Sequence, residues 1–252
     1  MKITSATIQN TRPYQEDRFF IHKFKDGTTL LGVFDGHGAE HTSDYLMHHV
    51  VAVFRKISKI RIRATPEEIL LNVFEKLHSN TKNDWCGSTA SIVWIHPKLN
   101  NIFVAILGDS PVILNLNGNI WKSPEHNVRT NYQEKTHAEE RGGYVRNGYL
   151  FDSRIYQGPG LQMSRAFGDK DLDRVLNRNP EIFSLPLNEA KWILCCTDGL
   201  LDPGHNLSEP SQIISYLDTT IENGLDITAD DLVRFGATLD AHDNSTAILI
   251  IP

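Results

Sequence analysis

Several short segments of the chain alternate apolar with polar positions and are rich in β-branched and aromatic side chains, a pattern typical of β-strands. Turn residues such as Asp26-Gly27 separate these segments. The dipeptide Asn117-Gly118, a hairpin signal, lies within the segment 112–121. The segments predicted as strands are 3–9, 18–24, 28–34, 88–95, 102–107, 112–121, 192–197 and 245–251.

Other segments carry apolar residues at helical spacing. We predict one helix over 39–57 and a second that begins at Pro66, where Thr65 is a good N-cap and Glu68 completes a capping box. Two more helices are expected to begin near Ser208 and Thr228.

The order of these elements predicts the fold class. Strands dominate both halves of the chain, and the helices come in pairs between them, which favours antiparallel sheets with helices packed outside in a layered α+β domain. Residues 124–171 are polar and glycine-rich, with short strand-like pieces only. Because no stretch has the composition of a linker, we expect a single domain over 1–252.

Composition narrows the classes of partner and compartment. The net charge of −6 does not support nucleic-acid binding, which requires a basic face. We expect no membrane segment, because no apolar run has spanning length and the first residues lack a signal-peptide core. The three cysteines, Cys86, Cys195 and Cys196, are odd in number and cannot all be paired in disulfides. We therefore expect reduced thiols and a cytoplasmic protein.

The main candidates for a functional site are aspartates at the ends of predicted strands. Asp35, Asp109 and Asp198 each follow an apolar strand, and Asp243 comes just before the last one. A single aspartate in such a place is common in turns. Together, the four residues predict a set of carboxylates held on rigid elements.

The neighbours of these aspartates indicate the kind of ligand. Gly36, Gly108 and Gly199 stand beside three of them, and a glycine lets the backbone approach an ion closely. Carboxylate and carbonyl oxygens select magnesium or manganese, and the histidines and cysteines have no zinc spacing. We take most histidines as surface or core residues and single out His37, next to Gly36.

A short N-terminal segment adds a cation to the candidate site. Arg12 stands four residues before Glu16 and five before Asp17, so a guanidinium and two carboxylates could meet there. A guanidinium binds phosphate through paired hydrogen bonds and keeps its charge.

Seven motifs in order then carry a resemblance to a known family. They resemble those of the metal-dependent type-2C serine/threonine protein phosphatases, in a compact bacterial-type form. The motifs are R12-x-x-x-E16-D17, F34-D35-G36-H37-G38, G87-S88-T89, G108-D109-S110, S164-R165-A166-F167-G168-D169, T197-D198-G199-L200 and D243-N244-S245-T246.

The resemblance implies a four-layer αββα sandwich, in which two central antiparallel β-sheets are flanked by helices, and a flap at about 129–171. It implies two Mn²⁺ or Mg²⁺ ions, with Asp35 bridging them, the Gly36 carbonyl on one, and Asp198 and Asp243 on the other. Glu16 and Asp17 would position waters. Asp109, together with Asp169, would support a weaker third ion.

The implied function is hydrolysis of phosphoserine or phosphothreonine in proteins by a metal-activated water, without a covalent intermediate. Arg12 would hold the phosphate, and His37 would protonate the leaving oxygen. The expected partner is a phosphorylated protein, with a monomer favoured. The alternatives are a pseudophosphatase or regulatory binding module, and a phosphatase of a small phosphorylated molecule.

Overall fold

Two antiparallel sheets form the centre of the protein in a computed structural model, which describes residues 1–155, 158, 160–201, 211–239 and 242–252. The strands of the first sheet, in spatial order, are β1 (Lys2–Ile8), β15 (Ser245–Ile251), β14 (Ala190–Cys196), β8 (Val112–Leu116) and β9 (Asn119–Lys122). Those of the second are β13 (Glu181–Pro186), β7 (Asn101–Leu107), β6 (Ala90–His96), β3 (Thr29–Phe34) and β2 (Arg18–Lys23).

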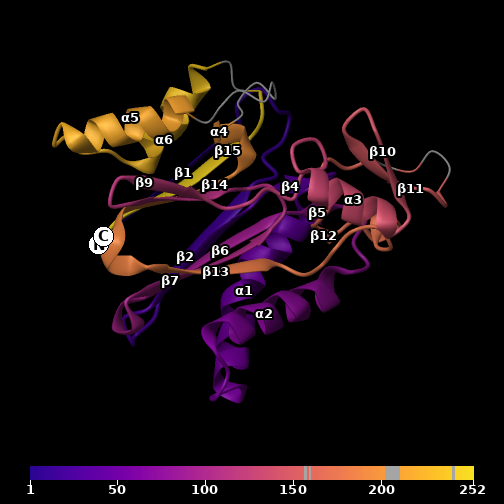
Figure 1. The fold of residues 1–252 in the computed structure, drawn as a ribbon, viewed down its shortest axis with the longest axis horizontal. Helices are drawn as coiled ribbons and strands as arrows, with labels where there is room; N and C mark the ends of the chain where they lie inside the picture. The colour runs from indigo at the N-terminus through magenta and orange to yellow at the C-terminus, as the bar shows by residue number, and fades with distance from the viewer. Residues whose placement is uncertain (156–157, 159, 202–210, 240–241) are drawn as a thin grey trace.

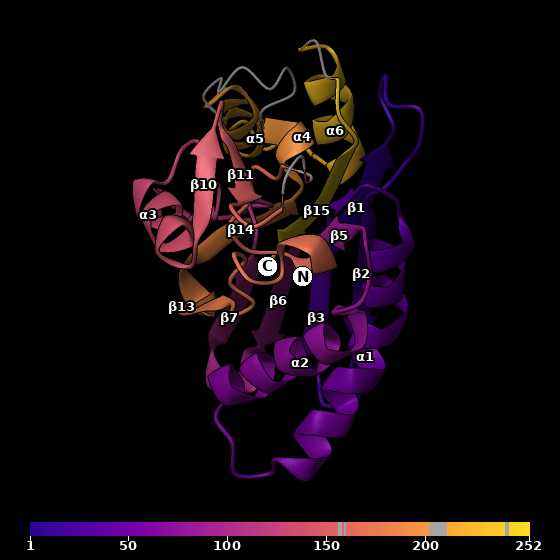
Figure 2. The same cartoon turned by 90° about the vertical axis from the view of Figure 1, so that its right-hand side faces the viewer.

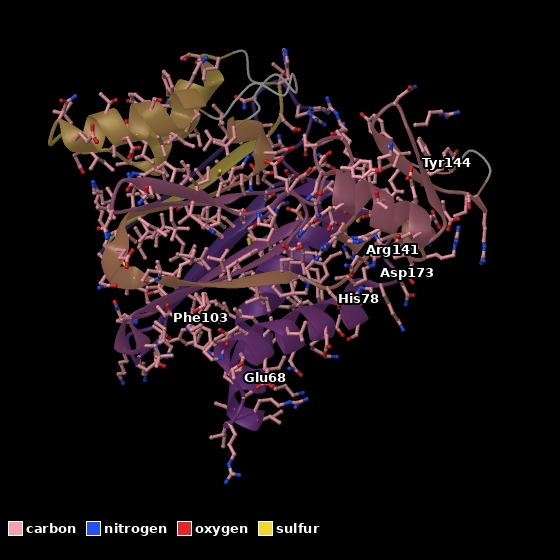
Figure 3. The ribbon with its side chains drawn as sticks, in the orientation of Figure 1. Glu68, His78, Phe103, Arg141, Tyr144 and Asp173 are labelled. Carbon is pink, nitrogen blue, oxygen red and sulfur yellow. The ribbon has the colours of Figure 1, made fainter. Side chains whose placement is uncertain are left out.

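Helices cover the outer faces of these sheets (Figure 1). Helices α1 (His41–Ile60) and α2 (Pro66–Thr81) pack on the second sheet, where Phe103 of β7 belongs to their apolar core (Figure 3). Helices α5 (Ser211–Glu222) and α6 (Ala229–Ala237) pack on the first sheet around the fully buried Trp192. The predicted mixture of helices with antiparallel sheets is confirmed.

A third apolar core lies between the two sheets. It joins Leu31 and Val104 of the second sheet to Val112, Ile193 and Ile248 of the first, all of them fully buried. Alternate side chains of each strand point to this core and to the helices, so strands such as β3 are buried on both faces. This explains why their sequences are almost continuously apolar.

Local signals in the sequence account for most element boundaries. Helix α2 has the predicted capping box, in which Thr65 Oγ1 accepts from the Glu68 N–H while the Glu68 carboxylate accepts from the Thr65 N–H. The Asn117-Gly118 turn has φ values of 52° and 95°, as a two-residue hairpin between β8 and β9 requires. Thr228 caps α6 as predicted, whereas the expected helix start near Ser208 lies outside the described residues.

Two of the longer elements have no counterpart in the sequence predictions. Helix α3 (Tyr132–Glu140) is polar almost all round and buries only Glu134 and Ala138, so it lacks an apolar stripe. Strand β13 lies at a sheet edge and ends on Pro186, and it is only partly buried. Strand β13 depends on tertiary contacts, whereas α3 has one local signal, the N-cap Asn131, whose Oδ1 accepts from the N–H groups of Gln133 and Glu134.

Smaller elements gather at one end of the sheets, where the hairpin of β10 (Gly143–Arg146) and β11 (Tyr149–Asp152) stands beside α3 (Figure 2). The short strands β12 (Phe167–Gly168), β5 (Gly87–Ser88) and β4 (Gly36–His37) form a further sheet. The remaining short helices are η1 (Pro97–Leu99), η2 (Lys170–Leu172), η3 (Leu187–Glu189) and α4 (Asp198–Leu201). Among the described helices, none combines the length and the apolar character that crossing a membrane requires.

Candidate active site

A cavity of about 500 Å³ lies at the end of the molecule that carries β4, β5 and β12. It collects nine of the ten residues predicted from the sequence, which are Arg12, Glu16, Asp35, Gly36, His37, Asp109, Asp169, Asp198 and Asp243. The tenth, Asp17, is buried and interacts electrostatically with Asp35.

Strand direction brings the four strand-end aspartates to this place. Strands β3 and β7 both pair antiparallel with β6, so they run in the same direction. Asp35 and Asp109 follow them and therefore lie at the same end of the sheet. In the other sheet β14 and β15 are antiparallel, so the end of one adjoins the start of the other. Asp198, after β14, and Asp243, before β15, therefore also lie at one end of their sheet.

The carboxylates raise one another's proton affinity. Burial raises the pKa of Asp35 well above its ordinary range, and the charges of Asp17, Asp198, Asp243 and Asp109 raise it further. Burial likewise raises the pKa of Asp17 to about 7, although Thr197 Oγ1 donates a 2.9 Å hydrogen bond to its Oδ2. These groups would bind a cation in place of protons.

Burial also raises the pKa of Asp109, to about 6. The Asn127 side chain opposes this effect, because its Nδ2 donates to Asp109 Oδ2 at 2.7 Å. The aspartates that line the cavity offer carboxylate oxygens, which are the ligands that Mg²⁺ and Mn²⁺ prefer.

The backbone at Gly36 fits the same purpose. A Cβ atom at this position would lie 2.5 Å from the Glu16 carbonyl oxygen and 2.7 Å from Ser43 Oγ, so no side chain can be accommodated. Ser43 Oγ itself donates to the Glu16 carbonyl at 2.6 Å. Packing of α1 against the Glu16 segment therefore brings the Gly36 backbone to the cavity wall, where its carbonyl could serve as a ligand.

His37 and Asp169 form a pair inside the cavity. His37 Nε2 lies 2.8 Å from Asp169 Oδ2 and 3.0 Å from Oδ1. Burial lowers the pKa of His37, but the adjacent Asp169 carboxylate, together with the charges of Asp109 and Glu16, raises it above its ordinary value. Asp169 itself has a left-handed backbone, with φ of 50°. The structure thus places Asp169 against His37; its predicted part in a third ion site stays a prediction.

Arg12 lies at the rim of the cavity and pairs with a predicted metal ligand. Its Nη2 donates to Asp243 Oδ2 at 2.7 Å, and 45% of its side chain is exposed. A guanidinium has five N–H donors, so this contact leaves others for an anion.

One positioning residue, Asn244, was not among the predicted site residues, although it lies inside one of the motifs. Its side chain connects the N-terminal and C-terminal segments of the site, because its Oδ1 accepts from the Glu16 N–H at 2.8 Å. Its Nδ2 donates to the carbonyls of Gln9 and Tyr14. The only sequence signal for this role was a polar residue next to Asp243. Its partners could not be predicted, because they lie more than two hundred residues away in the sequence.

A second polar cluster lies outside the cavity, where His126, Glu134 and Glu181 place ligand-type atoms within 4.8 Å of one another. Arg165 already occupies its centre, with ion pairs to both glutamates. His126 Nδ1 accepts from the Gly108 N–H at 3.1 Å, so the proton of the neutral ring is on Nε2. We therefore interpret the cluster as a structural ion-pair network rather than a metal site.

Comparisons with known proteins agree with this geometry. The model of the family "Protein phosphatase 2C" matches residues 1–245. "Probable protein phosphatase 2C 45" of Oryza sativa subsp. japonica is 31% identical over 69% of the chain and 61% of its own length. "Probable protein phosphatase 2C 56" of the same organism is 29% identical over 80% of the chain and 58% of its own length.

Solved structures show the same fold. A serine-threonine phosphatase 2C from Toxoplasma gondii superimposes with a TM-score of 0.78 at 21% identity, covering 99% of this chain and 94% of that one. A C. elegans sex determining protein gives a TM-score of 0.81 at 24% identity, covering 98% and 64% of the two chains. The chain spans about three fifths of the length of the curated relatives named above.

Proposed function

The chain belongs to the protein phosphatase 2C family, and on this premise we propose that it hydrolyses phosphoserine or phosphothreonine in proteins with the help of divalent metal ions. The observation that supports this most is the single cavity lined by Arg12, His37 and the strand-end aspartates. It combines an anion-binding cation, a protonatable imidazole and a set of oxygen ligands.

The residues around the cavity fit a divalent ion. Asp35, Gly36, Asp198 and Asp243 would hold Mn²⁺ or Mg²⁺, with Glu16 and Asp17 beside them. Asp109 and Asp169 would support a further, weaker ion. Bound ions would supply an activated water as the nucleophile and would offset the charge of the phosphoryl group.

The other roles belong to the chain's own side chains. Arg12 binds and orients the phosphate through the guanidinium donors that Asp243 does not use. His37 delivers a proton to the serine or threonine oxygen as the phosphoester bond breaks. Asp169 orients the imidazole, since its carboxylate lies 2.8 Å from Nε2, and its charge helps to raise the His37 pKa.

One assay tests this function directly. The protein is incubated with a phosphothreonine peptide, with p-nitrophenyl phosphate and with a nucleoside monophosphate, each with Mn²⁺ and with a chelator. We expect Mn²⁺-dependent release of phosphate from the peptide, and its loss in Asp35→Asn. Hydrolysis of the nucleotide alone would indicate a small-molecule phosphatase. No hydrolysis of any substrate would indicate a binding module.

A further inference from the structure

Part of the cavity wall is apolar, which binding a phosphate does not require. Trp85, Tyr149, Leu161, Met163 and Leu172 line the same cavity as the carboxylates. Phosphate and metal ions are recognised by charged and polar groups, so the solvent-exposed part of this apolar wall is available to another part of a ligand. A volume of about 500 Å³ leaves room for residues on either side of a phosphorylated one.

Two members of this wall are large aromatic residues that remain open to solvent. Trp85 is 63% exposed and Tyr149 is 42% exposed. Both residues therefore present apolar surface to water on the wall of one cavity, and tryptophan and tyrosine are among the side chains that most often dominate binding. Leu161 and Leu172, by contrast, are buried and form part of the small core beneath the flap.

Trp85 lies beside the backbone that follows His37 and lines the same cavity as this residue. It is the second residue before β5, and a Cβ atom placed on Gly38 would lie 3.7 Å from Cζ3 of its ring. Gly38 follows His37, so the indole borders the segment that carries the residue assigned as the proton donor. This position on the cavity wall suits contact with a side chain next to the phosphorylated residue.

Tyr149 comes from a different part of the fold. It begins β11, in the hairpin that stands at this end of the molecule (Figures 1 and 2). The Asn147-Gly148 turn, with φ values of 53° and 79°, fixes the hairpin just before it. The cavity thus has aromatic groups from both the sandwich and the flap, which a single extended peptide could contact together.

The charged group at this part of the wall also limits the substrate. Asp171 is exposed and lines the cavity next to Leu172. Its charge would repel an acidic residue that flanks the phosphorylated one.

From these observations we propose that Trp85 and Tyr149 form a subsite for a bulky apolar side chain adjacent to the phosphorylated residue of the substrate. The proposal rests on the function given above and names its substrate class, which is phosphopeptides with an aromatic or large aliphatic neighbour. Acidic neighbours are disfavoured.

The test uses phosphothreonine peptides that differ only at one position directly before or after the phosphothreonine, which is Phe, Leu, Ala or Asp. With Mn²⁺ present, we expect kcat/KM to be about tenfold higher for the preferred Phe peptide than for its Ala counterpart, a usual range for an apolar pocket. The Asp peptide should be the poorest.

Variants separate the subsite from general damage, because the readout is a ratio between two peptides. Trp85→Ala should reduce the Phe-to-Ala ratio to within about twofold, and Trp85→Phe should restore most of it. Tyr149→Ala should reduce it in part. Tyr132→Ala is the matched control, since Tyr132 is an aromatic residue 78% exposed on α3, away from the cavity lining.

Each outcome decides a separate point. Equal kcat/KM for all peptides, or a ratio that Trp85→Ala leaves unchanged, would overturn the subsite while the proposed function stands. A protein that hydrolyses none of the peptides loses the proposed function and the subsite with it.

Discussion

The chemistry of the His37 imidazole is set by the carboxylates around it. Burial alone would favour its neutral form, but Asp169, 2.8 Å from Nε2, and the more distant charges of Asp109 and Glu16 together raise the pKa above its ordinary value. A raised pKa favours the protonated imidazole, which can act on a leaving group that needs a proton. The identity of the leaving group therefore provides a test of this residue.

We predict that His37→Ala lowers kcat about 100-fold or more on a phosphothreonine peptide, as loss of a general acid does. The effect on p-nitrophenyl phosphate should be much smaller, because p-nitrophenolate leaves without a proton. Steady-state kinetics on both substrates with Mn²⁺ measure the difference. His41→Ala, an exposed histidine of α1, is the control. Equal losses on both substrates would contradict the assigned role.

His126 is a buried histidine with the opposite shift. Burial and, to a smaller extent, the Arg165 charge lower its pKa to about 4, and its Nδ1 accepts from the Gly108 N–H. In the unfolded chain the pKa returns to about 6.5. Since only the unfolded state then takes up a proton between these values, His126 reduces stability as the pH falls from about 6.5 to about 4.

The measurement is the melting temperature of wild type and His126→Gln at several pH values in the presence of a chelator. The variant should be less stable at pH 8, where it loses the contact with Gly108. Its deficit should shrink towards pH 5, because it lacks the histidine's proton-linked loss. His137→Gln, at an exposed position of α3, should follow the wild type at every pH. A deficit independent of pH would contradict the shift.

At the scale of elements, α3 is fixed by charge rather than by an apolar stripe. Arg165 donates from Nε to Glu134 Oε2 at 3.1 Å and from Nη1 to the Asn179 carbonyl at 3.0 Å, and it also pairs with Glu181 of β13. Arg165 and Glu134 are both buried. One guanidinium thus joins the two elements that the sequence pattern did not predict.

Removing this guanidinium should leave Glu134 buried without its partner. We predict that Arg165→Met lowers the free energy of unfolding by about 3 kcal/mol, the usual effect of breaking a buried ion pair. Glu134→Gln in the same chain should recover part of the loss. Urea unfolding measures both, and Arg234→Met, in an exposed pair with Asp230, should change stability little. A loss no larger than that of this control would disprove the role.

For the whole molecule, the site lies where the ends of both sheets meet. The termini pair with each other at the opposite end, because Lys2 of β1 faces Ile251 of β15. The chain thus begins and ends away from the cavity, while Arg12 and Asp243 meet within it. Burial raises the pKa of Asp35, and repulsion among the carboxylates collected there raises it further. Divalent ions should relieve this repulsion.

We predict that Mn²⁺ or Mg²⁺ raises the melting temperature of the chelator-treated protein, because the ions bind the folded state. The increase should be larger at pH 8 than at pH 5, since protons compete for Asp17, with its pKa of about 7, and for Asp35 and Asp109. Asp198→Asn with Asp243→Asn should abolish the increase, and the exposed Asp230→Asn should retain it. An increase that survives the double substitution would place the ions elsewhere.

The sequence by itself determined the strands, the capped helices and the acidic residues at strand ends, because these depend on periodicity and turn chemistry within a few residues. It did not reveal α3 or β13, which form because Arg165 and the sheet edge stabilise them. Only the tertiary structure decided which groups meet. His37 and Asp169 are 132 positions apart and Arg12 and Asp243 are 231 apart, and strand pairing across the chain brings them together. The aromatic wall of Trp85 and Tyr149 has the same origin, since no local pattern relates a turn after α2 to a hairpin of the flap.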